Sequence, residues 1–227
     1  MAILATSEGV FERTPIPVGN HVARCFSMVE IGTVSGEYQG VPNKNRKIRI
    51  TWELTNETKT YTNKEGEEIT KNHVISKTYT LSTGPKATLR KDLDSWRGQP
   101  FTDEQAKVFD VTKLLGVPCM LNVISAKSLK GKDYEKIQTI ATMPKGFPAP
   151  VAVNELFEFN YAEFSVEKFL SLPSFIREDM EKTPEFEAVR EAVNIAIAAA
   201  TETPTEDVKK KSSNIVGAED PDIDLPF

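Results

Sequence analysis

The clearest pattern along the chain is an alternation of apolar and polar positions in residues 46–55, RKIRITWELT. If this segment is extended, one face carries Ile48, Ile50, Trp52 and Leu54. The other face carries Lys47, Arg49, Thr51 and Glu53. Further segments rich in β-branched and apolar residues are 21–34, 73–82, 117–125 and 134–143. The pattern therefore predicts five strands.

The connections between these strands have the composition of turns and loops. Segment 35–45 contains Gly and Pro and is expected to end the first strand. The charged segment 56–72 is expected to form a long loop between the second and third strands, which would then make a hairpin with a polar, largely cationic outer face. A basic turn around Gly131 joins the fourth and fifth strands.

The period of the pattern changes between the third and fourth strands. Leu89, Leu93 and Trp96 are spaced for one face of a short helix that ends near Gly98. Residues 102–105, TDEQ, form a capping box that predicts the start of a second helix, with Gly116 as its end. Helices are therefore expected between the third and fourth strands.

Five strands with helices after the third predict a mainly β protein with an OB-fold, a partly open five-stranded barrel. This domain is expected to span residues 1–148. Residues 149–200 are expected to form a helical extension that packs on the barrel through Phe175, Ile176, Met180, Phe186 and Val189. Residues 201–227 lack apolar periodicity and are expected to form a disordered acidic tail.

Charge is divided unevenly along the chain. Residues 1–150 contain 21 Lys and Arg against 16 Asp and Glu, whereas residues 151–227 contain 7 against 17. A basic body followed by an acidic arm suggests that the body binds a polyanion.

Several classes of protein find no support in the sequence. The N-terminus lacks the pattern of a signal peptide and no apolar run is long enough to span a membrane, so a cytoplasmic protein is expected. With Cys25 and Cys119 far apart and two histidines in all, a zinc or thiol-redox site is not expected. The glycines near 32–40 do not match a phosphate-binding loop. No motif predicts catalysis, and no cofactor or metal is expected.

A groove for single-stranded nucleic acid needs cations for the phosphates and aromatic rings for the bases. Trp52 shares its phase with the apolar face of its strand, which favours the core, and Tyr79 is equally compatible with core and groove. Tyr38 and Tyr61 lie in polar segments, which favours stacking on bases. The DNA-binding candidates are Tyr38, Lys44, Arg46, Lys47, Arg49, Trp52, Tyr61, Lys77, Tyr79, Lys130, Lys132 and Tyr134.

The chain ends in AEDPDIDLPF, a segment in which aspartates precede a terminal aromatic residue. A calcium loop would need Gly at its sixth position and a carboxylate at its twelfth, and this segment has neither. A terminal Phe beside Pro and acidic residues suits a peptide that docks in an apolar pocket with a basic rim. The expected docking residues are Asp220, Asp222, Asp224, Leu225, Pro226 and Phe227.

Several ordered blocks of the sequence resemble the OB-fold single-stranded-DNA-binding proteins of tailed bacteriophages and prophages. These blocks, within roughly residues 15–148, are PVGNHVARCFSMVEIGT, KIRITWELT, ATLRKDLDSWRGQPFTDEQAKVFDVTKLLGVPC and KGKDYEKIQTIATMPKG. The end, DPDIDLPF, separately resembles the acidic tip of bacterial single-stranded-DNA-binding proteins.

The resemblance implies sequence-independent protection of single strands during phage DNA replication, recombination and repair in the bacterial cytoplasm. It also implies that the tip recruits replication or recombination proteins of the phage or host. The oligomeric state is not fixed by it. Two alternatives stay open: a metal-dependent nuclease built on an OB platform, and an OB-fold adaptor that does not bind DNA.

Overall fold

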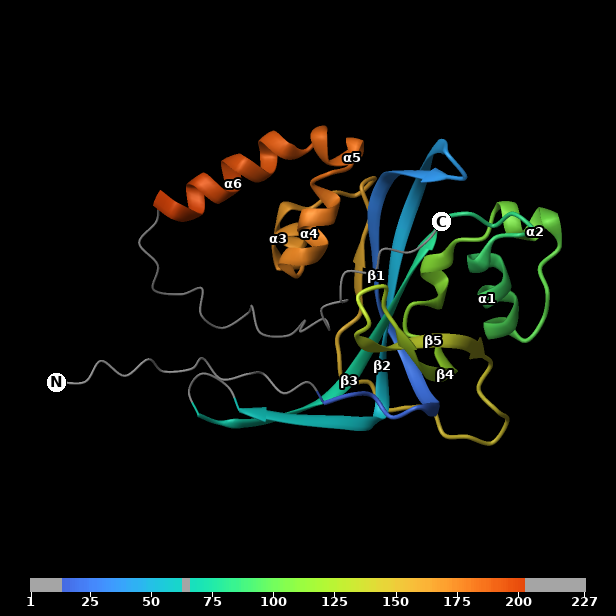
Figure 1. The fold of residues 1–227 in the computed structure, drawn as a ribbon. Coiled ribbons are helices and arrows are strands. Elements are labelled where there is room, and N and C mark those ends of the chain that lie inside the picture. The colour runs from blue at the N-terminus through green and yellow to red at the C-terminus, as the bar shows by residue number, and fades with distance from the viewer. Residues whose placement is uncertain (1–13, 63–65, 203–227) are drawn as a thin grey trace.

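The computed structural model describes residues 14–62 and 66–202, and the predicted acidic tip lies outside them. Five antiparallel strands form a half-barrel in the order β3-β2-β1-β4-β5 (Figure 1). Their bounds are β1 (Gly19–Tyr38), β2 (Val41–Thr62), β3 (Glu68–Thr80), β4 (Pro118–Lys127) and β5 (Asp133–Ala141). The expected mainly β, OB-like fold is confirmed.

Short helices connect β3 to β4, as the change of period predicted. α1 (Thr88–Arg97) ends at Gly98, whose φ of 71° lies in the left-handed region that glycine adopts without steric cost. α2 (Asp103–Lys107) begins with the predicted capping box at Thr102. The predicted extent of this second helix is wrong, because the side chain of Asp110 caps a separate 3₁₀ turn, η1 (Val111–Leu114).

The first three strands, β1, β2 and β3, are longer than the sequence pattern predicts. Large parts of both segments that were expected to be loops are paired strand: β1 and β2 meet at Gln39 and Gly40, and β2 and β3 pair out to Thr62 and Glu68. Positive φ at both Gln39 and Gly40 fits a two-residue turn of the type that matches strand twist. The two resulting ribbons project from opposite ends of the sheet (Figure 1).

The segment after the barrel contains one strand as well as helices. β6 (Phe157–Phe159) pairs in parallel with Ser27–Val29 of β1. It is followed by four helices, α3 (Val166–Ser171), α4 (Ser174–Met180), α5 (Pro184–Glu187) and α6 (Arg190–Glu202). The strand was not expected from the sequence. No described helix has the length and apolar character needed to cross a membrane.

Two apolar cores lie on opposite sides of the sheet. The first lies between the sheet and α1, where the rings of Trp52 and Trp96 have centroids 5.7 Å apart. The second joins Val29 and Ile31 of β1 to β6 and the C-terminal helices through Phe169, Met180 and Phe186, among others. Figure 1 shows α1 and α2 on one side of the sheet and α3–α6 on the other. The sheet is therefore covered on both faces near β1.

Candidate nucleic-acid interface

Polar side chains line the face of β2 and β3 that points away from the first core. The register pairs Lys47 with Thr80, Arg49 with Thr78 and Thr51 with Ser76. Thr51 and Ser76 are joined by a hydrogen bond of 3.0 Å between their hydroxyls, and Lys47 Nζ donates to Thr80 Oγ1 at 3.1 Å. We call these six residues the outer strip. Because alternate residues of a strand share a face, this strip follows directly from the pattern of residues 46–55.

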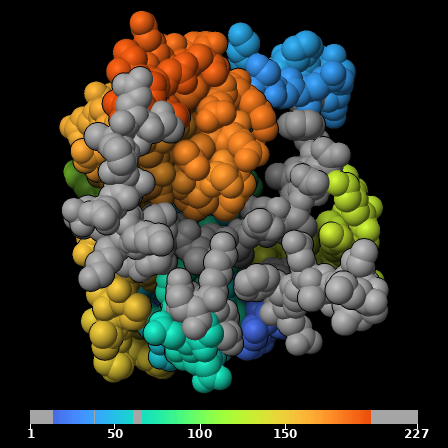
Figure 2. Space-filling model, turned by 90° about the vertical axis from the view of Figure 1, so that its left-hand side faces the viewer, coloured from blue at the N-terminus to red at the C-terminus, as the bar shows by residue number. Residues whose placement is uncertain are grey.

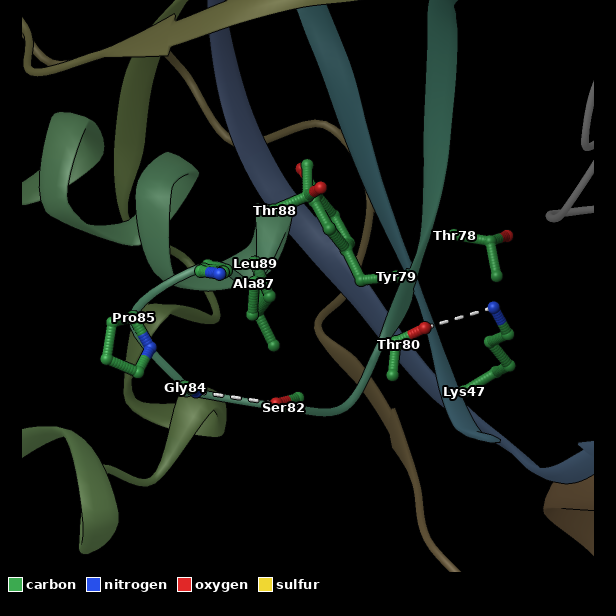
Figure 3. Close-up of a pocket in the computed structure, with 11 residues that line it drawn as sticks. Lys47, Thr78, Tyr79, Thr80, Ser82, Gly84, Pro85, Ala87, Thr88 and Leu89 are labelled. Carbon is green, nitrogen blue, oxygen red and sulfur yellow. Dashed lines mark hydrogen bonds between the residues drawn. The ribbon is translucent and has the colours of Figure 1, made fainter. Parts of the chain in front are cut away.

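One end of the outer strip opens into a groove of about 770 Å³ between β3 and the start of α1. Two lysines, Lys47 and Lys86, line this β3–α1 groove together with the hydroxyls of Thr78, Thr80, Ser82 and Thr88. Figure 3 shows Lys47 directed at Thr80 across the strands, opposite the loop that carries Gly84 and Pro85. Among the described residues, the groove therefore presents cations and hydroxyls with no acidic side chain in its lining.

Partial burial affects the chemistry of Lys47. Desolvation lowers the pKa of its ammonium group below the ordinary value. A phosphate brought to this position would favour the charged form and would offset part of that desolvation.

The middle of the outer strip borders a second hollow, of about 400 Å³, between β2–β3 and α4. We call it the β2–α4 hollow. Its polar lining includes Arg49, Lys59 and Lys71, with Glu155 as the only acidic lining residue among those described. Its apolar lining includes Phe26, Leu156, Phe157, Phe175 and Ile176. The guanidinium carbon of Arg49 lies 5.3 Å from the centre of the Phe175 ring. The hollow therefore combines cations with aromatic surface.

Two of the aromatic candidates predicted from the sequence belong to the first core. Trp52 is fully buried against Trp96. Tyr79 is 3% exposed, and its hydroxyl donates to Asp92 at 2.8 Å. The Trp52 ring is not accessible to a base in this arrangement, which corrects its inclusion among the DNA-binding candidates. Tyr79 lines the β3–α1 groove, but its ring is too deeply buried to stack face to face on a base. Both lie on the inner face because they are in phase with the buried residues of their strands.

Two of the cationic candidates are engaged with carboxylates. Lys77 Nζ donates to Asp92 at 2.7 Å and lies 5.1 Å from the centre of the Tyr79 ring. Arg46 is paired with Glu30, and this hydrogen bond raises the pKa of the guanidinium. The charge of each cation is therefore balanced by a carboxylate of the protein, which makes Lys77 and Arg46 weaker candidates for binding phosphate.

The remaining candidates lie on projecting parts of the half-barrel. Lys44 is exposed on the β1–β2 ribbon, Lys130 and Lys132 are exposed in the β4–β5 turn, and Tyr134 is half-buried beside that turn. None of these four residues lines the two hollows. In Figure 2 the ribbon (light blue) and the turn (yellow-green) are both visible on the same side of the molecule. The side chains of Tyr38 and Tyr61 lie outside the described part of the structure.

Sequence reasoning identified Lys47 and Arg49 but missed other residues that line the hollows. Lys59 and Lys71 fall in a segment that was expected to be a loop, and Lys86 precedes a helix. Phe175 was expected only to pack on the barrel, and it also lines the β2–α4 hollow. Its presence there depends on the docking of residues 153–176 against the strands, which no local pattern indicates.

No group of three or more His, Cys, Asp and Glu side chains is placed to hold a metal ion within the described residues. The sequence matches no known family model. It also matches none of the functionally characterised proteins with which it was compared.

Proposed function

We propose that this protein binds single-stranded DNA, without sequence preference, along the outer face of β2 and β3. The observation that carries the proposal is the lining of the two neighbouring hollows, where five basic side chains accompany one acidic side chain. These cations are Lys47, Lys86, Arg49, Lys59 and Lys71. Cations spaced along a groove bind the regularly spaced charges of a phosphate backbone.

The fold supports the same proposal. In OB-folds the face of the second and third strands is a common site for oligonucleotides, although a fold alone does not establish a function. Here that face also carries four hydroxyls, from Thr51, Ser76, Thr78 and Thr80, which can bond to phosphate oxygens. None of these groups reads a particular base, so the expected binding is independent of sequence.

The cellular role follows from the resemblance described above. Coating of single strands protects them during DNA replication, recombination and repair in a phage-infected bacterial cell. The acidic sequence at 220–227 would recruit replication or recombination proteins, with Phe227 entering an apolar pocket of the partner and the aspartates meeting its basic rim. The protein itself would act as a binding protein rather than as an enzyme.

The direct test is a titration of fluorescently labelled oligo-dT and of matching duplex with the full chain, over a series of salt concentrations. We expect tighter binding to the single strand, with an affinity that falls as salt rises because counterions are released. Parallel samples with and without magnesium report cleavage. Lack of binding at low salt would contradict the proposal and favour an adaptor, and magnesium-dependent cleavage would favour a nuclease.

Charge-reversal variants locate the binding face. Lys59→Glu and Lys86→Glu are each expected to weaken binding and to reduce the slope of log affinity against log salt by at least about 0.7. Lys145→Glu serves as the matched control, because Lys145 is exposed and lines neither hollow. Equal losses in all three variants would show that binding depends on overall charge and not on this face.

A further inference from the structure

A β-bulge in β1 places two consecutive residues, Phe26 and Ser27, along the β2–α4 hollow. Cys25 pairs with Trp52 and Ser27 pairs with Thr51, so Phe26 is an extra residue with no partner on β2. In such a bulge two residues of one strand lie opposite a single partner residue, so Phe26 and Ser27 share the outer face with Thr51. Cys25 and Met28 consequently point into the first core, whereas Phe26 lines the hollow on the other face.

Phe26 belongs to neither apolar core, although it is only 3% exposed. A buried aromatic ring ordinarily contributes to a core, because its large apolar surface is best removed from water by packing. Here the ring forms part of a hollow that protein atoms leave unfilled. This arrangement suits a flat, partly apolar ligand.

The wall opposite the strands comes from the C-terminal segment. Residues 153–157 and the start of α4 line the hollow, and they contribute the rings of Phe157 and Phe175. In Figure 2 the C-terminal segment (orange) lies above the projecting β2–β3 ribbon (teal). Two aromatic residues of this wall therefore line the same hollow as Phe26.

The polar lining supplies hydrogen-bond donors. Lys59 and Lys71 bring ammonium groups and Arg49 a guanidinium group. Asn72 also lines the hollow, and its Nδ2 atom is buried without a hydrogen-bond partner among the described residues. A buried donor without a partner is unfavourable and gains stability when a ligand supplies an acceptor. Nucleobases carry such acceptors on their edges.

We propose that the β2–α4 hollow receives one unstacked base of the bound single strand, against the half-buried rings of Phe157 and Phe175, with the buried Phe26 behind them at the strand side. The proposal rests on the proposed function, since the strand must first lie along β2 and β3. The volume of about 400 Å³ lies within the usual range of ligand pockets, about 300–1,000 Å³. The phosphates on either side of this base would meet Lys59 and Lys71.

This pocket would also explain discrimination against double-stranded DNA. In a duplex each base is paired and stacked, and it must be unpaired and unstacked before it can enter such a site. In a single strand the pairing cost is absent. Since every base has a π-face, stacking on aromatic rings needs no particular sequence. The C-terminal segment would thus contribute selectivity for single strands, whereas the cations contribute affinity.

Photochemical crosslinking tests the position of the base directly. Oligo-dT with 5-iodouracil at single positions is bound to the full chain, irradiated, and the crosslinked peptides are identified by mass spectrometry. We expect crosslinks to Phe157 or Phe175. Normal binding with crosslinks only elsewhere would overturn the base pocket and leave the proposed function standing. Absence of binding would contradict the proposed function itself.

Substitution provides the second measurement. Phe175→Leu keeps apolar bulk but removes the ring, and we expect it to weaken binding to oligo-dT about 5- to 100-fold, with little change for duplex. Phe164→Leu is the matched control, because Phe164 packs in the second core and does not line the hollow. Equal affinities of Phe175→Leu and Phe164→Leu for oligo-dT would overturn the proposal.

Discussion

At the scale of single residues, Glu53 holds the C-terminal segment against the half-barrel. Its side chain is fully buried and is paired with Arg24, itself nearly buried. It also accepts hydrogen bonds from the backbone N–H of Asn154 at 2.9 Å and from its Nδ2 at 2.6 Å. A buried carboxylate is tolerated only with such compensation. Glu53 therefore anchors Asn154, which belongs to the segment that lines the β2–α4 hollow.

We expect Glu53→Leu to lower the free energy of unfolding by about 3–5 kcal/mol, because the charge of Arg24 is left buried without its carboxylate partner. Urea denaturation measures this change. Glu187→Gln breaks an exposed ion pair with Arg190 and should leave the denaturation midpoint unchanged. A Glu53 variant as stable as the wild type would show that the pair contributes nothing to the docked arrangement.

A second carboxylate joins β1 to α5 and makes stability depend on pH. Burial acts to raise the pKa of Glu185, but hydrogen bonds from the Thr33 side chain and backbone outweigh it, and the pKa lies below its ordinary value. The backbone N–H of Thr33 donates to Glu185 Oε2 at 2.8 Å. The ionised form is therefore favoured in the folded state.

The sign of the pH effect follows from this lowered pKa. A group with a depressed folded pKa stabilises the fold above its unfolded pKa, about 4.3 for Glu, and loses that contribution as pH falls through the folded value. Wild type should accordingly exceed Glu185→Gln in stability near pH 7, with the difference shrinking below about pH 4. Urea midpoints across pH 3–7 test this. Glu163→Gln, an exposed residue outside the contact, is the control, and a pH-independent difference would refute the assignment.

At the scale of elements, α5 approaches β1 at a position that only glycine can occupy. Gly32 has a φ of 106°, and a Cβ atom there would lie 2.6 Å from Thr183 Oγ1 and 2.9 Å from Glu185 Oε2. Gly40 also has a positive φ, but apart from its chain neighbours no described residue has a heavy atom within 4 Å of its would-be Cβ. A substitution at Gly32 therefore tests backbone strain together with a steric clash, whereas a substitution at Gly40 tests backbone strain alone.

Gly32→Ala should lower the free energy of unfolding by about 2–4 kcal/mol, since it adds a steric clash to backbone strain. Gly40→Ala should cost only about 1–2 kcal/mol. Limited proteolysis should cut the C-terminal helices of Gly32→Ala faster than those of the wild type, and should cut those of Gly40→Ala at the wild-type rate. Similar behaviour of the two variants would show that α5 is not held by this approach.

The elements also show what the sequence could and could not predict. Alternation in 46–55 predicted which residues of β2 face the core, because side-chain direction is a local property of a strand. The paired strands within 56–72 were not predicted, because the alternating Thr, Lys and Glu residues of this segment have no apolar face. Whether such a polar segment pairs depends on its partner strand, which the local sequence does not reveal. The bulge at Phe26 was missed because two consecutive apolar residues do not reveal which one faces the core.

At the scale of the whole molecule, the half-barrel and the C-terminal segment depend on each other. Val29 and Ile31 of β1 are buried only because β6 and the helices cover them. The periodicity of residues 174–189 predicted helices that pack on the barrel. The location of the second core could not be derived from it, because two distant segments build that core together.

A chain that ends at residue 148 should therefore be poorly soluble. It would expose the outer apolar surface of β1, and large exposed apolar patches promote association. Size-exclusion chromatography and binding of a hydrophobic dye report this outcome. A chain that ends at residue 202 keeps both cores and is the control. A soluble, monomeric and fully folded 1–148 fragment would contradict the interdependence.

β1 carries a consequence for the order of events during synthesis. It pairs with β2, β4 and β6, and its residues contribute to both cores. During synthesis, its parallel partner at Phe157–Phe159 emerges from the ribosome more than a hundred residues after β1. Contacts between such distant segments form slowly, and an apolar strand is prone to aggregate until its partner has been made and has paired with it. The nascent chain is accordingly most vulnerable between completion of the β1–β2 ribbon and release of the C-terminal helices.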